Sequence, residues 1–225
     1  MKKISALIPY KPDNGRRDFL WSFVQMRYRE FLPEVELCVG FDDSELFCRA
    51  HALNEAAKQA SGDVFITVDV DLVFDLGLIG RIIAVIDSHP WIIPFSRAYR
   101  LNQAATDRLI EAGLPETFEV AREDVEHDQI VLGAYMNVMT RNAFETVGGL
   151  DERFKGYGFE DMALAMSLDT LCGPHYRMEG TIYHLWHPWA EFYHKNYEKS
   201  RHLHQRYEMA SGKAELMKSL IAERQ

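Results

Sequence analysis

Two aspartates at the end of an apolar run have the type and spacing of residues that could bind a cation. Residues 64–71 read VFITVDVD, so Asp69 and Asp71 stand two positions apart. In an extended strand, side chains two apart share a face and lie about 6.6 Å apart along the chain. Two carboxylates at that distance repel each other by roughly 2.5 kcal/mol at an effective dielectric of about 20. A hard cation such as Mg²⁺ or Mn²⁺ would relieve that repulsion, although one aspartate could equally be a cap and the other a solvated carboxylate.

A second acidic group follows a glycine-rich segment. Residues 148–161 read GGLDERFKGYGFED and lead into the apolar run MALAMSL, which predicts a tight loop that delivers a helix N-terminus. Glu160 and Asp161 would stand at that N-terminus, where backbone N–H groups and the helix dipole favour ionised carboxylates. A carboxylate presented in this way can accept a proton from a hydroxyl, a role that contributes about 10²–10⁴ in rate. The alternative is that Asp161 only caps the helix and Glu160 is a first-turn acid.

The elements that must position these residues alternate along the first half of the chain. Apolar runs predict strands at Ile4–Ile8, which stops at Pro9, at Glu36–Val39 and at Val64–Val68, with a helix between successive strands. This βαβ pattern is typical of a parallel sheet with helices on its faces. Ligands of such sheets bind beyond the carboxyl ends of the strands, which is where the acidic pair falls. We therefore expect an α/β, Rossmann-like domain with a mostly parallel central sheet flanked by helices.

The helices and the second half of the chain are less regular. Phe19, Phe23, Met26 and Tyr28 give a rough helical stripe. The other expected elements are helices at about 46–60, 79–86, 141–147 and 160–168, strands at 91–93, 133–140 and 181–185, loop and helix at 97–128, and a terminal helix at 190–210. We expect one domain over residues 1–225, with about 1–95 as a nucleotide-binding half and about 96–225 as an acceptor-binding half and C-terminal helix.

The composition is that of a globular protein with an acidic surface. The chain has 225 residues and a formal charge of −9, which argues against nucleic acid as a partner, because that affinity is built on Lys and Arg. Three cysteines, far apart and without a CxxC pair, indicate reduced thiols in a cytoplasmic protein. The first apolar run is shorter than the ~7–15 residues of a signal peptide, and no run reaches the ~20 residues of a membrane helix. We expect a cytoplasmic protein with no membrane span.

The glycine-rich acidic segment also resembles a known motif. GGLDERFKGYGFED is similar to the GG-x-DE-x-F-x-G-W-G-x-ED segment of GT-A-fold glycosyltransferases, both the galactosyltransferase type and the family-two-like inverting enzymes. The resemblance implies that Asp161 is the catalytic base and that Glu160 contacts the acceptor or donor sugar. Tyr157 stands where Trp is usual; with Gly158 it would form the acceptor-side platform, and the change of aromatic residue bears on the choice of acceptor.

The resemblance extends to the N-terminal third of the chain. The opening IPYKPDNGRRDFLWSFV is similar to the first strand and loop of these enzymes, and its compact form is similar to that of small actinobacterial and phage-type transferases. The turn GFDDS resembles the acidic end of their second strand, and FCRAHALNEAAKQASGD resembles the helix that approaches the nucleotide. These similarities imply nucleotide-sugar-binding roles for Pro9, Tyr10, Arg16, Asp42 or Asp43, Arg49, Asn54 and Asp69.

Two histidines near the last expected strand would complete the implied metal site. Residues 181–188 read TIYHLWHP, so His184 and His187 have i, i+3 spacing. Related enzymes complete the site with a His, sometimes paired with a second ligand three positions away, and imidazole suits Mn²⁺ beside carboxylates. The resemblance implies Asp71 and Asp69 with His184 or His187 as ligands, His184 being preferred because it directly follows the strand. The alternative is a packed histidine among aromatic neighbours.

Together these features predict a metal-dependent glycosyltransferase that moves a hexose from a nucleotide-sugar, expected to be a UDP-sugar, to a hydroxyl acceptor with inversion. Mn²⁺ or Mg²⁺ would be the cofactor, and the acceptor would be a glycan, a protein or another hydroxyl compound. Three alternatives stay open. They are a retaining transferase on the same fold, a sugar nucleotidyltransferase, for whose basic phosphate loop KPDNGRR is only a partial candidate, and a nucleotide-sugar- or glycan-binding module with a dead site.

Overall fold

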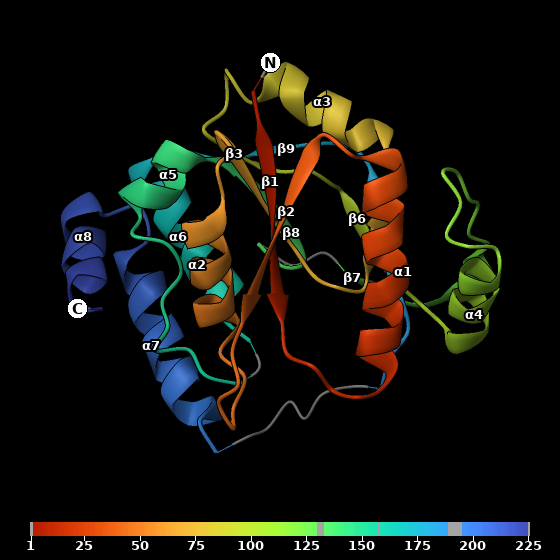
Figure 1. Ribbon diagram of the computed structural model, residues 1–225. Coiled ribbons are helices and arrows are strands. Elements are labelled where there is room, and N and C mark those ends of the chain that lie inside the picture. Colours follow the sequence, from red (N-terminus) through yellow and green to blue (C-terminus); the bar gives the residue numbers. More distant parts are fainter. Residues whose placement is uncertain (1, 130–132, 157, 189–194, 225) are drawn as a thin grey trace.

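The computed structural model describes residues 2–129, 133–156, 158–188 and 195–224, and a six-stranded sheet lies at the centre of the fold (Figure 1). Its strands, in spatial order, are β2 (Val35–Phe41), β1 (Ile4–Tyr10), β3 (Val64–Val68), β8 (Met136–Thr140), β5 (Trp91–Ile93) and β9 (Tyr176–Arg177). β1 pairs in parallel with β2 and β3, and β5 with β9, whereas β8 is antiparallel to β3 and β5. The sheet is therefore mostly parallel, as the sequence predicts.

A second, smaller sheet contains the strand that ends at His184. Its spatial order is β4 (Leu72–Phe74), β10 (Thr181–His184), β6 (Arg97–Leu101) and β7 (Val125–Gln129). β10 is antiparallel to β4 and parallel to β6, and β6 is antiparallel to β7. Because β4 follows β3 after the turn that contains Asp69 and Asp71, the acidic pair lies where the chain passes from the first sheet to the second.

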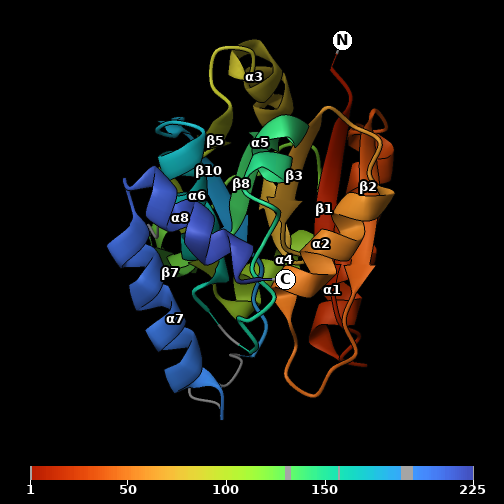
Figure 2. The same ribbon diagram turned by 90° about the vertical axis from the view of Figure 1, so that its left-hand side faces the viewer.

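Helices cover both faces of the larger sheet. They are α1 (Arg16–Phe31), α2 (Arg49–Gln59), α3 (Gly77–Val85), α4 (Gln103–Glu111), α5 (Arg141–Thr146), α6 (Glu160–Leu171), α7 (Tyr197–Ala210) and α8 (Ala214–Ala222), with a short 3₁₀ turn at Arg122–Asp124. Figure 1 shows α1 on one side of the sheet and α2, α5 and α6 on the other. In Figure 2, α7 and α8 form an outer layer, and both pack on α6. The C-terminal helices therefore lie against the helix that begins with Glu160 and Asp161.

The core explains why the strands are apolar throughout. All five residues of β3 are buried, and six of the seven residues of β1 are. A strand covered on both faces by helices reads as a continuous apolar run instead of an alternating one. A second cluster of buried residues joins the last helices to α6, and its members are Phe154, Ala163, Tyr207, Ala210, Met217 and Leu220. The tail of the chain is thus attached to the fold through its own apolar core.

Three expectations about the elements are wrong in detail. The first strand does not stop at Pro9: β1 continues to Tyr10, and Pro9 pairs with Gly40 of β2 beyond the point where the β1–β3 register ends at Leu7. The missing N–H of proline is tolerated there because β3 offers no partner at that position.

The expected apolar stripe of α1 is not its buried face. Phe19 is 45% exposed and Met26 is 51% exposed, and of the four expected residues only Tyr28 is fully buried. The helix instead buries Leu20, Trp21, Val24 and Arg27 along with Tyr28.

The segment 97–128 contains two strands of the second sheet, β6 and most of β7, in addition to α4 and loop. The terminal helix at 190–210 is α7 over its described part, since residues 190–194 lie outside the described residues. α8 follows it at positions where no element is expected. Within the described part of the chain, no helix is both long and apolar enough to cross a bilayer.

Candidate active site

Asp71, His184 and His187 converge on one buried point between the two sheets. His184 ends β10 and pairs in register with Leu72 of β4, which brings it beside Asp71; the N–H of Leu185 also donates to the carbonyl of Asp71 at 2.8 Å. Nε2 of His184 lies 3.4 Å from Oδ1 of Asp71, and Nε2 of His187 lies 3.2 Å from Oδ2. The three potential ligand atoms are all within 4.8 Å of one another. One ion can therefore contact all three residues.

The remaining ring nitrogens decide which atoms face the aspartate. Nδ1 of His184 lies 2.9 Å from the carbonyl oxygen of Leu185, and Nδ1 of His187 lies 2.6 Å from that of Pro188. A carbonyl only accepts, so each Nδ1 carries the proton in the neutral ring and each Nε2 presents a lone pair. Lone pairs on two Nε2 atoms then face the two oxygens of a carboxylate, an arrangement that is repulsive without a cation between them.

The electrostatics of the three residues agree with a cation site. Asp71 is 2% exposed, and among the described residues no hydrogen-bond donor satisfies its Oδ1. Burial opposes ionisation of Asp71, but His184 and His187 in their charged form, together with Arg17, outweigh it and hold the pKa of this carboxyl well below its usual value. Burial lowers the pKa of His184, which keeps the ring neutral and able to coordinate. The residues present therefore fit a divalent ion such as Mn²⁺, which accepts mixed oxygen and nitrogen ligands.

Asp69 has a different partner from Asp71. β3 ends at Val68, so the two aspartates lie in a turn and not in a strand, and they do not share one face in the way expected of a strand. Oδ1 of Asp69 contacts Nε of Arg49 at 2.9 Å and Nη2 at 2.8 Å. The acidic pair is thus divided between the metal-ligand cluster, which contains Asp71, and an ion-pair cluster around Arg49.

Three carboxylates surround the guanidinium of Arg49. Besides Asp69, Nη1 of Arg49 lies 2.5 Å from Oδ1 of Asp161 and 3.6 Å from Oε1 of Glu160. Asp69 follows the last residue of β3, Arg49 begins α2, and the two acids begin α6, so three elements meet here. Because one cation cannot neutralise three anions, a proton or a bound ligand is needed to balance the cluster.

Burial and crowding raise the pKa values of the two acids of α6. Burial raises the pKa of Asp161 to about 7, Arg49 opposes the shift, and the charges of Glu160 and Asp69 add to it. Burial likewise raises the pKa of Glu160, whose Oε2 has no hydrogen-bond partner among the described residues. A carboxyl that titrates near neutral pH is suited to general-base catalysis, because it is ionised at working pH and still basic enough to take a proton.

The glycine-rich loop delivers these acids through an unusual backbone. Gly156 and Gly158 have φ values of +85° and +93°, and Phe159, which precedes α6, has φ +78°. A Cβ built on Gly158 would meet nothing within 4 Å, so this part of the loop borders open space. Tyr157, the expected acceptor platform, lies outside the described residues.

Two of the other expected nucleotide-binding residues, Asn54 and Asp42, form hydrogen bonds within the protein. Asn54 is engaged by the glycine-rich loop: its amide donates to the carbonyl of Leu150 and to Glu152, and accepts from the N–H of Leu150. Oδ2 of Asp42 accepts from Ser44 and from the N–H of Cys48, so Asp42 organises its own turn. The side chains of Asn54 and Asp42 are thus both engaged by neighbouring protein groups in this arrangement.

Pro9 and Tyr10 end β1, and Asp43 is exposed in the turn after β2. The hydroxyl of Tyr10 donates to Asp18 at 2.8 Å. Arg16 is directed to the second sheet's side, where it pairs with Asp107 of α4 and donates to the carbonyl of Trp186.

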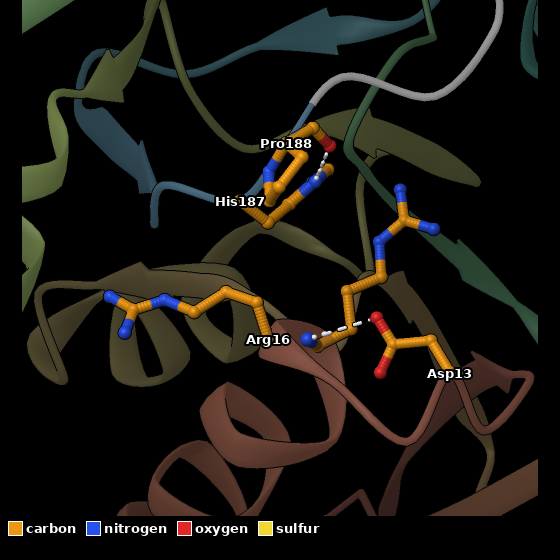
Figure 3. Close-up of a pocket in the computed structure, with 5 residues that line it drawn as sticks. Asp13, Arg16, His187 and Pro188 are labelled. Carbon is orange, nitrogen blue, oxygen red and sulfur yellow. Dashed lines mark hydrogen bonds between the residues drawn. The ribbon is translucent and has the colours of Figure 1, made fainter.

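A basic residue that the sequence reasoning missed stands at the cation site. Arg17 is the residue whose Nε lies 3.7 Å from Oδ2 of Asp71, while the neighbouring Arg16, which was expected, is occupied elsewhere. Successive helix residues point about 100° apart, and the two side chains leave the start of α1 in different directions, Arg17 towards Asp71 and Arg16 towards Asp107. Figure 3 shows Asp13, Arg16, His187 and Pro188 around a small open pocket, which Arg17 also lines.

Comparisons with known proteins can now be set beside this geometry. Residues 46–148 match the family model described as glycosyl transferase family 2. The chain is similar to the catalytic domain of Drosophila beta1,4-galactosyltransferase 7 solved with xylobiose, with a TM-score of 0.53, 16% identity, and coverage of 89% of this chain and 80% of that one. The chain therefore has the GT-A fold, and nearly half of it matches a glycosyltransferase family model.

Two further solved structures share this fold. One is glucosyl-3-phosphoglycerate synthase from Mycobacterium tuberculosis, solved with Mn²⁺, UDP-glucose and phosphoglyceric acid. Its TM-score is 0.53 at 13% identity, and the match covers 94% of this chain and 80% of that one. TarS residues 1–349 of S. aureus, solved with UDP-GlcNAc, has a TM-score of 0.52 at 11% identity, with coverage of 99% and 71%. A comparison with curated protein sequences finds no match. The family match includes Arg49, Asp69 and Asp71 of this chain but ends before Asp161, His184 and His187.

Proposed function

We propose that this chain is a glycosyltransferase that moves a hexose from a UDP-sugar to a hydroxyl acceptor, with inversion at the anomeric carbon and with Mn²⁺ as cofactor. The observation that carries the proposal is the buried carboxylate of Asp71, whose oxygens lie 3.2 and 3.4 Å from the unprotonated Nε2 atoms of His187 and His184. Solved structures of the same fold support the choice of ion and donor, since beta1,4-galactosyltransferase 7 was solved with manganese and UDP-Gal.

The donor side is assigned to the turn after β3 and to the end of β10. Asp71, His184 and His187 would hold Mn²⁺, which as a Lewis acid neutralises charge on the departing nucleoside diphosphate. Arg17, beside Asp71, supplies a further positive charge to the diphosphate. Asp69 remains free to accept from the ribose or donor sugar through the oxygen that Arg49 does not bind. Pro9, Tyr10 and Asp43 line the nucleoside end, in the half formed by about residues 1–95.

The acceptor side is assigned to the start of α6. Asp161 takes the proton of the acceptor hydroxyl, and Arg49 orients its carboxylate through the 2.5 Å contact at Nη1. Glu160, which is buried beside it, binds a hydroxyl of the donor or acceptor sugar through the oxygen that has no partner among the described residues. Gly158 and Tyr157 form the platform on which the acceptor lies. These residues belong to the half formed by about residues 96–225, which also contributes the histidines.

The donor is tested most directly by thermal unfolding in the presence of UDP- and GDP-sugars, each with and without Mn²⁺. A ligand at a hundredfold excess over Kd stabilises the folded state by about 2.7 kcal/mol, which is readily measured. We expect stabilisation by a UDP-sugar that depends on Mn²⁺. Stabilisation by GDP-sugars alone, or by UDP-sugars regardless of the metal, would contradict the assignment.

The chemistry is tested with the product and with Asp161→Asn. NMR analysis of the anomeric configuration separates inversion from retention. Asp161→Asn removes the base but keeps the size of the side chain, so we expect transfer to fall by about 10²–10⁴ with donor affinity unchanged. Transfer at the wild-type rate by this variant would overturn the role of Asp161. Release of pyrophosphate from a nucleoside triphosphate would instead identify a nucleotidyltransferase, and binding without turnover would identify a binding module.

A further inference from the structure

Phe159, the residue before α6, has a left-handed backbone conformation that a residue with a side chain does not favour. Phe159 stands immediately before Glu160 with φ +78° and ψ −23°, in the left-handed region. Glycine adopts this conformation readily, whereas a residue with a Cβ does so only when its surroundings compensate for the strain. Gly156 and Gly158 are already present at neighbouring positive-φ positions, so the phenylalanine at 159 calls for a separate physical reason.

The ring of Phe159 is held by α7. Its centroid lies 4.9 Å from the ring of His204, at an interplanar angle of 35°, and 5.7 Å from the ring of Tyr197. Aromatic rings at these separations attract one another beyond the effect of burial alone. His204 is 6% exposed and lies on the face of α7 that also carries Tyr207 into the apolar cluster around Phe154. The ring contact therefore ties the start of α6 to a helix that has its own core.

Within the part of the chain that the structure describes, His204 contributes its ring here and no hydrogen bond through Nε2. Among the described residues, neither a donor nor an acceptor reaches its Nε2, and its Nδ1 lies 3.8 Å from Glu208 of the same helix. A phenyl ring at position 204 could therefore make the same contact with Phe159. This property provides a conservative variant for the test below.

The position of Phe159 couples the ring contact to the catalytic carboxylate. The carbonyl of Phe159 accepts from the N–H of Ala163 at 2.9 Å, so this residue is the first anchor of the helix that presents Asp161. On the opposite side, Arg49 holds Asp161 at 2.5 Å. A change of φ at position 159 rotates the chain that enters α6 and so moves the first turn of the helix against Arg49.

We propose that Phe159 and His204 are positioning residues: the ring of His204 keeps Phe159 in its left-handed conformation, and this conformation sets the carboxylate of Asp161 for the acceptor hydroxyl. The inference rests on the proposed role of Asp161 as the base. In this assignment each residue acts through the placement of Asp161. Displacement of a reacting group by about 1 Å can lower a rate by about 10²-fold.

The test compares His204→Ala with His204→Phe, using His202→Ala as the matched control. His202 is exposed on the same helix, so its substitution by alanine perturbs the helix without touching Phe159. We expect His204→Ala to lower kcat for transfer by about 10- to 100-fold with KM for the donor and Kd for Mn²⁺ unchanged, while His204→Phe and His202→Ala keep kcat within about twofold. Phe159→Ala should resemble His204→Ala, since alanine keeps the Cβ that disfavours the left-handed region but lacks the ring that His204 holds.

Several outcomes would overturn the inference. A merely structural effect of His204→Ala would lower kcat only in proportion to the fraction of folded protein measured by thermal unfolding, so wild-type kcat per folded molecule would contradict the positioning role. Wild-type kcat in His204→Ala, or equal losses in His204→Phe and His204→Ala, would also contradict it. The proposed function fails separately: if Asp161→Asn transfers at the wild-type rate, the base is misassigned, whereas an inactive Asp161→Asn beside a fully active His204→Ala removes only the positioning role.

Discussion

At the scale of single residues, the cation site depends on lone pairs that face one another. Asp71→Asn replaces one carboxylate oxygen by an amide that cannot coordinate, and His184→Ala or His187→Ala removes one nitrogen ligand. We expect each histidine variant to weaken Mn²⁺ binding at least tenfold, about 1.4 kcal/mol, and Asp71→Asn to weaken it more because it also removes the charge. Titration of Mn²⁺ followed by electron paramagnetic resonance measures this directly.

The matched control for the metal prediction is His89→Ala, because His89 stacks on Tyr176 at the far edge of the sheet and contacts none of the three ligands. The sequence left open which of His184 and His187 binds metal, and the structure places both beside Asp71. Wild-type affinity in either histidine variant would assign the site to the other histidine alone.

The pKa of Asp161 predicts how the rate depends on pH. A base must be ionised, and burial raises the pKa of this carboxyl to about 7, so kcat should rise about tenfold per pH unit below 7 and level off above it. Arg49→Gln removes the charge that opposes the shift, so the rising limb should move to higher pH. Glu160→Gln removes a charge that adds to it, so the limb should move to lower pH. Movement of both limbs in one direction would contradict the assignment.

The same pKa also bears on stability. A carboxyl whose folded pKa is raised keeps its proton in the folded state after the unfolded chain has lost it. The free energy of unfolding should therefore decline as pH rises from the unfolded value of 3.8 towards about 7, as far as this group contributes.

At the scale of elements, the glycine-rich loop is fixed to α2 through Asn54. Gly148 and Gly149 both have positive φ, +66° and +69°, so alanine at either position carries a backbone cost of about 1–2 kcal/mol. A Cβ on Gly149 would also lie 2.6 Å from Oδ1 of Asn54, whereas the first contact of one on Gly148 is at 3.6 Å. We expect Gly149→Ala to lower the free energy of unfolding by at least about 1 kcal/mol more than Gly148→Ala, because it also disturbs the bonds between Asn54 and Leu150. Urea unfolding measures the difference, and equal losses would contradict the role of Asn54.

The elements also show where sequence reasoning succeeds and where it fails. β3 and β5 were predictable to the residue because both faces are buried, and a fully covered strand must be apolar throughout. β6, which reads RAYRL, was hidden because two of its five residues are arginines, and Arg100 is buried by donating to Glu126 and to the carbonyl of His187. The apolar stripe of α1 gave the wrong buried face, because the burial of a helix face depends on which elements pack beside it. No described element covers Phe19 or Met26 fully.

The candidate site follows the same division. The segment that ends in Glu160 and Asp161 was predictable because glycines at positive φ and paired acids leave a dense local pattern. The position of Arg17 beside Asp71 could not be predicted, because the two residues are distant in sequence. The separation of Asp69 from Asp71 could not be predicted either, because it depends on the ion pair between Asp69 and Arg49. Spacing along the chain predicts which residues are near one another locally, but it does not predict which distant residue each of them contacts.

At the scale of the whole molecule, the C-terminal helices are joined to the catalytic loop by a buried polar network. Asp151, whose side chain is fully buried, accepts from Arg153 and from the hydroxyl of Tyr207 at 2.7 Å. Arg224 donates to that hydroxyl and to the carbonyls of Val147 and Gly149. The network therefore connects the end of α8, the middle of α7 and the loop that leads to Asp161.

Loss of Arg224 should destabilise the whole network and not only the C-terminal end of the chain. Arg224→Met keeps much of the apolar stem but leaves two backbone carbonyls and a buried hydroxyl without their donor, so we expect a loss of about 2–4 kcal/mol in the free energy of unfolding. Arg206→Met is the control, because Arg206 is half exposed and pairs only with Glu223 among the described residues, which predicts a loss below about 1 kcal/mol. Urea unfolding of both variants measures the difference.

The pH dependence of that loss tests whether the charge of Asp151 takes part. Burial opposes ionisation of Asp151, but Arg153, Tyr207 and Arg224 together lower its pKa below the unfolded value of 3.8. A lowered pKa contributes stability that is present above the unfolded value and disappears as pH falls through the folded one. The difference in free energy of unfolding between wild type and Arg224→Met should therefore be constant from about pH 5 to 8 and shrink below about pH 4. A difference that stays the same in acid would show that Arg224 acts through the carbonyls and the hydroxyl alone.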